Sequence, residues 1–397
     1  MSIFGGKKRL NLGVIVGNSF GGYLSFDEYV DHFLLPFSPR FRNIDFSIAT
    51  LNSVGVTDFL IFTDKDKEIV ARYLMSSWPF LDFYVFDKLD LKTEFIEFFN
   101  EYANQKQVSM VGMINGGYPV WFNLRHYHQE YVKTKSTAFR WKDGEREACP
   151  LIVLDKNLFM KKMTAIIEKH DTLIEVPKFR EEIDADMPVT DITDGYVIPF
   201  KSIEEYYRIH IDMIDSYLTY DQYNAYVPIR GEKARLVPAT IARGCHFIHS
   251  IVGEDSDVSG KIQDSVIFSN VKIAPTAIVK NSIILPGNHI GAGAVIQNTI
   301  IDEFSGDNSI PNIERNVVIG NPKPSKRNED YPKILNFGVT LIGKDVVIPA
   351  RTEIGGNCYI ESFVKPSKIA ALRTIPDGKS ILHDEPTPPT PPQLPKA

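Results

Sequence analysis

The chain has 397 residues, of which 43% are hydrophobic and 24% are charged, with a formal net charge of −6. These values are typical of a soluble globular protein of about two domains. The negative charge gives no electrostatic reason to expect nucleic acid or an anionic membrane as a partner, and we predict neither.

The cysteines and the N-terminal residues indicate a cytoplasmic protein. Cys149, Cys245 and Cys358 lie far apart and form no CxxC pair, which argues against a disulfide framework or a zinc site. The apolar run after the basic residues 7–9 is too short for a signal peptide. No segment approaches the roughly 20 apolar residues of a membrane span.

The first predicted strand, Leu12–Val16, is a short apolar run that is followed by Gly17, Gly21 and Gly22 in a polar loop. In a doubly wound sheet such glycines let backbone N–H groups approach a nucleotide phosphate. However, no arginine or lysine occurs from residue 10 to residue 39. Transfer of a nucleotidyl group needs cations against the triphosphate charge, so we favour a plain turn for this loop.

Strands and helices alternate in the first half of the chain. The predicted strands after the first are 58–63, 83–86 and 108–114, and the predicted helices are 65–75 and 93–105. This alternation favours a parallel or mixed sheet with helices on both faces. The aromatic stripe of the second helix is interpreted as core; it comprises Phe95, Phe98, Phe99 and Tyr102.

The periodicity changes near Arg235. Isoleucine then recurs every six residues, for example at Ile342, Ile348, Ile354 and Ile360. A longer repeat of Ser or Thr before two aliphatic residues starts at positions 250, 265, 282 and 299, with spacings of 15, 17 and 17. This pattern predicts a parallel β-helix with three strands per coil. A polar excursion, Asn321–Asn336, interrupts it.

The segment from Pro36 to Phe46, PFSPRFRNIDF, resembles the signature of sugar-nucleotide pyrophosphorylases, and most closely that of the ADP-glucose pyrophosphorylase (glucose-1-phosphate adenylyltransferase) family. The matching positions are Pro36, Phe37, Phe41, Arg42, Ile44, Asp45, Phe46 and Gly55. The resemblance implies an α/β nucleotidyltransferase-like (Rossmann-like) N-terminal domain followed by a left-handed parallel β-helix. The expected domains are 1–232, 233–383 and a Pro-rich disordered tail, 384–397.

The chain departs from this family where its chemistry should lie. Active members carry a lysine where this chain, aligned without a gap, has His32, and metal-binding aspartates where it has Gly117 and Pro199. Neither glycine nor proline can ligate Mg²⁺ through its side chain. The sugar-phosphate motif Glu-Lys-Pro is also absent, and residues 141–144 form a predicted turn in its place.

The resemblance and the departures together suggest a non-catalytic, regulatory subunit of ADP-glucose pyrophosphorylase in glycogen or starch biosynthesis. Such a chain would hold no cofactor itself, and Mg²⁺ would be bound by a catalytic partner in a heterotetramer. Arg40 and Arg42 are the candidate effector- or anion-binding residues, although a local ion pair of Arg42 with Asp45 would explain the second arginine equally well.

Other functions remain open at this stage. Asp184, Asp186, Asp191 and Asp194 would be the replacement metal ligands of a rearranged active enzyme, although a solvated acidic loop is the favoured interpretation. A hexapeptide acyltransferase would need a histidine base, and the available histidines are His246, His249 and His289. His126 and His128 are interpreted as surface or packing residues. A free-standing sugar-phosphate or nucleotide sensor is the last alternative.

Overall fold

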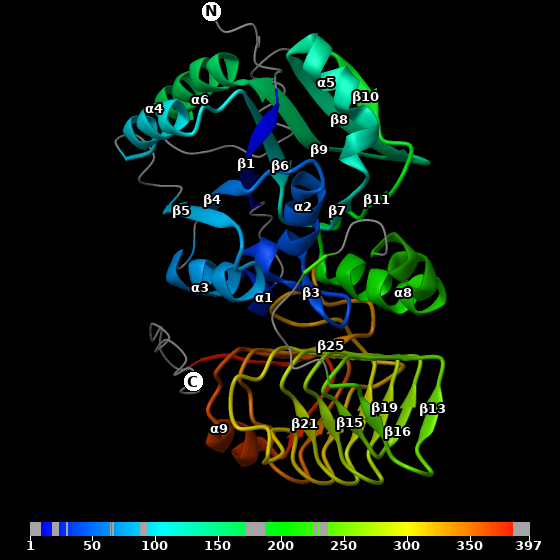
Figure 1. The fold of residues 1–397 in the computed structure, drawn as a ribbon. Coiled ribbons are helices and arrows are strands. Elements are labelled where there is room, and N and C mark those ends of the chain that lie inside the picture. Colours follow the sequence, from blue (N-terminus) through cyan, green and yellow to red (C-terminus); the bar gives the residue numbers. More distant parts are fainter. Residues whose placement is uncertain are drawn as a thin grey trace, which may run out of the picture.

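The computed structural model describes residues 9–17, 24–28, 31–63, 65, 67–87, 94–170, 187–224, 229–230 and 237–383. An α/β body formed by the N-terminal half lies on a parallel β-helix formed by the C-terminal half (Figure 1). Four predictions concern residues outside the described ranges, namely Gly21 and Gly22, Asp184 and Asp186, the domain boundary at residue 232, and the Pro-rich tail.

The N-terminal body is built on a seven-stranded mixed sheet of order β10-β8-β9-β6-β1-β4-β5. Its strands are β1 (Leu10–Val16), β4 (Asp58–Thr63), β5 (Asp82–Asp87), β6 (Met110–Asn115), β8 (Ser136–Asp143), β9 (Arg146–Asp155) and β10 (Val189–Asp191). β1 pairs in parallel with β4 and β6, whereas β9 runs antiparallel to β6 and β8. The prediction of a parallel or mixed sheet is confirmed, and the sheet is mixed.

Helices cover both faces of this sheet (Figure 1). The helices, with 3₁₀ turns labelled η, are α1 (Ser25–Glu28), η1 (His32–Leu34), α2 (Asn43–Asn52), α3 (Lys67–Ser77), α4 (Glu94–Gln105), η2 (Leu124–Tyr127), α5 (His128–Thr134), α6 (Lys156–His170) and α8 (Ile203–Asn224). Two short pairs complete the body: β2 (Pro36–Phe37) with β3 (Phe41–Arg42), and β7 (Val120–Trp121) with β11 (Tyr196–Val197).

Alternation along β1 divides the core between the two faces, as the period of two in a strand requires. Val14 and Val16 pack with α4 and α6, whereas Ile15 packs with α2 and η1 on the other face. Phe95 and Phe99 of α4 are fully buried, which confirms the interpretation of the aromatic stripe as core. The sequence predicts no strands at β8 and β9 and places a turn at residues 141–144. In the structure residues 141–143 belong to β8, paired with β9, and the turn follows at residues 144–145.

The C-terminal body consists of three parallel sheets. The first contains β12 (Thr240–Ile241), β15 (Asp257–Val258), β18 (Lys272–Ile273) and β21 (His289–Ile290). The second contains β13 (His246–Ile248), β16 (Lys261–Gln263), β19 (Ile278–Lys280), β22 (Val295–Gln297), β24 (Val318–Ile319), β26 (Glu353–Ile354) and β28 (Thr374–Ile375). The third contains β14 (Ile251–Val252), β17 (Val266–Ile267), β20 (Ile283–Ile284), β23 (Thr299–Ile301), β25 (Thr340–Ile342), β27 (Tyr359–Ile360) and β29 (Ser380–Ile381).

The registers reproduce the repeat seen in the sequence. Ile251 pairs with Val266, Val266 with Ile283, and Ile283 with Ile300, which are the predicted steps of 15, 17 and 17 residues. One isoleucine or valine from each face of a coil points inward, so that the stacked coils share one apolar interior. The predicted β-helix is confirmed, and its left-handed sense stays a prediction.

Two irregular segments complete the β-helix. The excursion after β24 buries Leu335 in the cluster that the β-helix shares with the N-terminal body, and its Tyr331 ring lies 5.5 Å from that of Tyr359 on β27. Helix α9 (Pro366–Leu372) inserts Ile369 into the interior between β27 and β28. Among the residues that the structure describes, no helix is both long enough and apolar enough to cross a bilayer.

Candidate functional site

The carboxyl ends of β1, β4 and β6 lie at one edge of the sheet, where doubly wound folds bind nucleotides. In this chain a buried hydrogen-bond network occupies that edge. Asn43 Nδ2 at the start of α2 donates to the carbonyl oxygens of His32 (2.9 Å) and Gly117 (3.0 Å). Ser47 Oγ donates to the carbonyl of Asn115 at 2.6 Å. These polar groups therefore serve packing between α2, η1 and β6.

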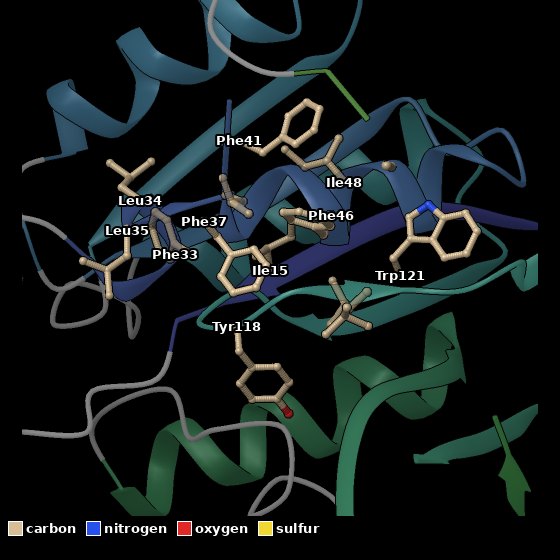
Figure 2. Packing of buried hydrophobic residues seen from close by; sticks show 14 of the residues in the cluster. Ile15, Phe33, Leu34, Leu35, Phe37, Phe41, Phe46, Ile48, Tyr118 and Trp121 are labelled. Carbon is tan, nitrogen blue, oxygen red and sulfur yellow. The ribbon is translucent and has the colours of Figure 1, made fainter. Parts of the chain in front are cut away.

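Phe33 of η1 packs over the ends of β1 and β6 and is fully buried (Figure 2). A Cβ atom built on Gly17 would lie 2.9 Å from Cδ1 of Phe33, and one built on Gly116 would lie 3.1 Å from Cβ of Phe33. The two glycines thus allow close approach of an aromatic side chain to both strand ends. Such a surface favours apolar contact over charged phosphate groups.

The two residues predicted to stand at degenerate metal positions, Gly117 and Pro199, lie on adjoining segments. Gly117 is buried just beyond β6, and its N–H donates to Asn115 Oδ1 at 2.8 Å. Pro199 follows β11, and the neighbouring Ile198 N–H donates to the carbonyl of Pro119 at 3.0 Å. The fold therefore brings the two segments together, and neither residue supplies a carboxylate there. His32, which was expected to stand in the place of the family lysine, is buried in η1.

The described members of the acidic loop are engaged elsewhere. Asp191 binds Arg140, with 2.6 Å between Arg140 Nε and Asp191 Oδ1. Asp194 accepts hydrogen bonds from Tyr127 Oη (2.6 Å) and faces His126 Nδ1 (2.7 Å). Within the described part of the chain, no three His, Cys, Asp or Glu side chains are placed to share a metal ion.

The three histidines considered for an acyltransferase base have separate surroundings. His249 lies between Asp215 and Asp264, and His289 Nδ1 lies 2.9 Å from the carbonyl of Asn308. His246 belongs to β13 at the first coil and is exposed.

Arg42 joins the two bodies of the protein. Its guanidinium binds Glu303 of the β-helix, with 2.6 Å between Nη2 and Oε1 and 3.2 Å between Nη1 and Oε2, and also donates to the carbonyl of Leu34. The expected local ion pair with Asp45 is therefore incorrect as the main role of this side chain. Asp45 instead accepts from the backbone N–H of Arg42 at 2.8 Å, as a capping residue of α2.

Asp45 is fully buried and holds two aromatic side chains in place. It accepts hydrogen bonds from Tyr73 Oη (2.6 Å) and Trp78 Nε1 (2.9 Å). Burial raises the pKa of this carboxyl to about 6, and the hydrogen bonds oppose that rise. The isoleucine-aspartate-phenylalanine part of the signature thus forms the first turn of α2 and packs it against Tyr73 and Trp78.

A buried charge cluster surrounds Glu303. Burial alone would raise its pKa, but Arg42 and Lys344 hold the pKa of Glu303 below its usual range. The neighbouring Asp302 is also buried, and desolvation together with the charge of Glu303 raises its pKa to about 7. The register places Asp302 where the two preceding coils hold Phe268 and Leu285. An acidic residue in this otherwise apolar row is the sequence feature that could have pointed to the charge cluster.

Arg40 lies on the same interface but is more exposed. Its Nη1 is 3.3 Å from Glu254 Oε1, and its side chain is 41% exposed. The carbonyl of the preceding Pro39 accepts a hydrogen bond from Ser269 N–H at 3.1 Å. The signature segment therefore connects the α/β body to the β-helix, and Arg40 is the candidate effector residue with the greater access to solvent.

Comparisons with known proteins agree with this architecture. Residues 232–342 match the model of the family described as GlmU-like, C-terminal hexapeptide. The chain is 30% identical over 161 residues to the glucose-1-phosphate adenylyltransferase of Corynebacterium jeikeium, covering 40% of this chain and 38% of that protein. It is 30% identical over 163 residues to the same enzyme of Corynebacterium diphtheriae, covering 40% and 36%, and 25% identical over 198 residues to that of Acetivibrio thermocellus, covering 48% and 42%.

The chain thus matches less than half the length of these relatives. The similarities, together with the fold, support a relationship to the glucose-1-phosphate adenylyltransferase family, with a GlmU-like hexapeptide domain.

Proposed function

We propose that this protein is a regulatory, catalytically inactive subunit of an ADP-glucose pyrophosphorylase. It would bind a catalytic subunit that makes ADP-glucose from ATP and glucose 1-phosphate, in a cytoplasmic heterotetramer. The observation that carries the proposal is the edge of the sheet at β1 and β6, where Phe33 packs against both strand ends.

The charge of the expected substrates explains why this edge argues against catalysis. Nucleotidyl transfer places a triphosphate, a sugar phosphate and Mg²⁺ together, and catalysis depends on positioned cations and metal ligands. Gly117 and Pro199 supply no metal-binding side chain, and no lysine or arginine occurs from residue 10 to 39. In this proposal Mg²⁺ is bound by the catalytic partner, and this chain changes the partner's response to an effector.

The test is pyrophosphate release from ATP and glucose 1-phosphate with Mg²⁺. It compares this protein alone, the catalytic subunit of the same organism alone, and the two mixed. We expect this protein alone to be at least roughly a thousandfold slower than the catalytic subunit, since missing metal and oxyanion contacts cost that much. In the mixture we expect the effector concentration for half-maximal response to change about 5- to 150-fold, the usual range of coupling between sites.

Two outcomes would contradict the proposal. Turnover by this protein alone, at a rate near that of the catalytic subunit, would favour an enzyme with rearranged metal ligands. An unchanged mixture, in which size-exclusion chromatography finds no complex, would favour a sensor.

Arg40→Ala distinguishes an effector contact from a structural role within the same assay. Because Arg40 is partly exposed, the variant should fold and assemble normally while the effector response of the mixture weakens. Arg72→Ala is the matched control, since this exposed arginine lies on α3. An unchanged effector response in the Arg40 variant would remove Arg40 from the candidate site.

A further inference from the structure

Helix α8 lies between the sheet of the N-terminal body and the β-helix (Figure 1). Two histidines take part in its contact with the coils. The ring of His210, on α8, lies 5.7 Å from that of Phe268, which follows β17. His249, which follows β13, faces Asp215 of α8. We call this contact, from His210 to His249, the α8 joint.

His210 is fully buried, and only one of its two ring nitrogens is hydrogen-bonded. Nδ1 donates to the carbonyl of Tyr206, one turn earlier, at 2.8 Å, so the neutral ring carries its proton on Nδ1. Nε2 is buried and has no hydrogen-bond partner within the described part of the chain. The rings of Phe37, Tyr206 and Phe268 lie 4.2 to 5.7 Å from it. A proton added at Nε2 would therefore place a cation among aromatic side chains, away from water.

The charges of the interface do not compensate such a cation. Arg42, Asp302 and Glu303 act on the neighbouring Tyr206. For His210 itself, burial lowers the pKa to about 4, and the hydrogen bond to the Tyr206 carbonyl opposes this only in part. His210 is therefore neutral in the closed joint at neutral pH.

His249 has the opposite surroundings at the other end of the joint. Its Nε2 lies 2.7 Å from Asp215 Oδ1, and its Nδ1 lies 2.9 Å from Asp264 Oδ1. The neutral ring could donate to only one of these carboxylates, whereas the imidazolium donates to both. The hydrogen bonds to Asp215 and Asp264 raise the pKa of His249 above its ordinary value. Because Asp215 belongs to α8 and His249 to the β-helix, protonation of His249 favours the closed joint.

We propose that the α8 joint is a pH-sensitive contact, which closes most tightly when His210 is neutral and His249 is protonated. Acidification opens the joint by protonating His210, and alkaline pH loosens it by deprotonating His249. The signs follow from linkage, because protons that bind the open form more tightly favour opening and those that bind the closed form more tightly oppose it. In the open form both histidines return towards the ordinary pKa of 6.5, so closure is strongest near that pH.

The α8 joint also supports the signature segment. The ring of His210 lies 5.0 Å from that of Phe37, and Tyr206 Oη donates to the carbonyl of Pro36 at 2.6 Å. Pro36 and Phe37 form β2, whose hairpin with β3 carries the two signature arginines. Opening of the joint therefore loosens the hairpin that connects the two bodies, which makes their docking respond to protons.

Hydrogen exchange of the full chain, measured by mass spectrometry between pH 4.5 and 8.5, tests the proposal. After correction for the intrinsic pH dependence of exchange, it gives the opening constant of residues 203–216. We expect this constant to be smallest near pH 6.5 and to rise roughly 20-fold by pH 4.5, as the pKa of His210 requires. By pH 8.5 we expect a rise of about threefold, the size typical of an exposed ion pair.

Two variants separate the two histidines. His210→Phe keeps a ring in the buried site and removes the titrating nitrogen, so opening should no longer rise towards pH 4.5. His210→Leu tests the same point if the larger ring is not accommodated. His249→Gln removes the charge at the other end, so opening should no longer rise towards pH 8.5. His246→Gln is the control, because His246 is exposed on β13 outside the joint, and its profile should match wild type.

Circular dichroism would verify that each variant is folded. A wild-type opening constant without a minimum between pH 4.5 and 8.5 would overturn the proposal. So would a variant at His210 that keeps the acid rise of the wild type, or a His249→Gln variant that keeps the alkaline rise.

Discussion

The role assigned to Arg42 differs most between the sequence analysis and the structure. In the signature it is a candidate for anion binding, whereas in the fold its guanidinium is committed to Glu303 and to the carbonyl of Leu34. Both side chains are largely shielded from solvent, so removal of either partner would leave the charge of the other uncompensated. The role of Arg42 is therefore to join the bodies, and Arg40 remains the residue to test for an effector contact.

We predict that Asp302 makes the free energy of unfolding depend on pH. Its pKa in the folded protein is about 7, above the ordinary value of 3.8, so the folded state binds the proton more tightly than the unfolded state. The protonated form of Asp302 is tolerated in its buried site, so its contribution to stability is complete at acidic pH. This contribution is lost as pH rises towards 7. Asp302→Asn should gain stability relative to wild type between pH 4 and 7.5, on the order of 2–4 kcal/mol.

Urea unfolding of both proteins at several pH values measures this difference. Asp307→Asn is the control, because Asp307 is exposed and its pKa lies below its ordinary value, so its contribution changes only at more acidic pH. A difference between wild type and Asp302→Asn that does not vary with pH would contradict the raised pKa.

At the scale of the element, the coils of the β-helix depend on close packing at their corners. Gly320 follows β24 with φ of +88°, and a Cβ atom there would lie 1.7 Å from the carbonyl oxygen of Gln297 on the coil before. Gly244, before β13, has φ of +89° but no atom within 4 Å of such a Cβ. The two glycines therefore separate the effect of backbone conformation from that of packing between coils.

We predict that Gly320→Ala destabilises the protein much more than Gly244→Ala does. Gly244→Ala bears only the cost of a left-handed conformation, about 1–2 kcal/mol. Gly320→Ala adds a collision with backbone, and we expect a total of about 4 kcal/mol or more. Denaturant titration gives the free energy of unfolding of both variants. Equal losses in the two variants would contradict the prediction, because they would mean that the coils separate at Gly320 without a cost in stability.

At the scale of the whole molecule, the two bodies share one interface that extends from the signature segment to α8. Tyr207 Oη of α8 donates to the carbonyl of Asn281 at 2.7 Å, and the ring of His210 lies 5.7 Å from that of Phe268. His249, just after β13, has Nε2 2.7 Å from Asp215 of α8 and Nδ1 2.9 Å from Asp264. Since both ring nitrogens face carboxylates, the doubly protonated imidazolium suits this position best.

This histidine predicts a pH-dependent contact between α8 and the β-helix. The hydrogen bonds to Asp215 and Asp264 raise the pKa of His249 above 6.5, so its contribution to stability is complete below that value and is lost as pH rises through the folded pKa. NMR titration of the His249 ring should find the raised pKa, and Asp215→Asn should lower it. His128→Gln is the control: it removes the signal of an exposed histidine on α5 and should leave the titration of His249 unchanged. A pKa at or below 6.5 would contradict the contact.

Much of the fold was accessible from the sequence because its signals are local. The spacing of the Ser/Thr repeats predicted the strand registers of the β-helix, since each coil places equivalent residues in one row. The edges of β4 were predicted to the residue, because an apolar run between polar residues defines a buried strand. The β8–β9 pair was missed because its second strand follows a charged turn and carries no clear alternation.

The sequence by itself determined the α/β body, the β-helix and the identity of the residues at Gly117 and Pro199, all of which follow from residue type and short-range periodicity. Only the tertiary structure decided that Phe33 packs against both strand ends and that Arg42 binds Glu303. These contacts join residues as much as 261 positions apart. They depend on how the two bodies dock and how the coils stack, which no local pattern encodes.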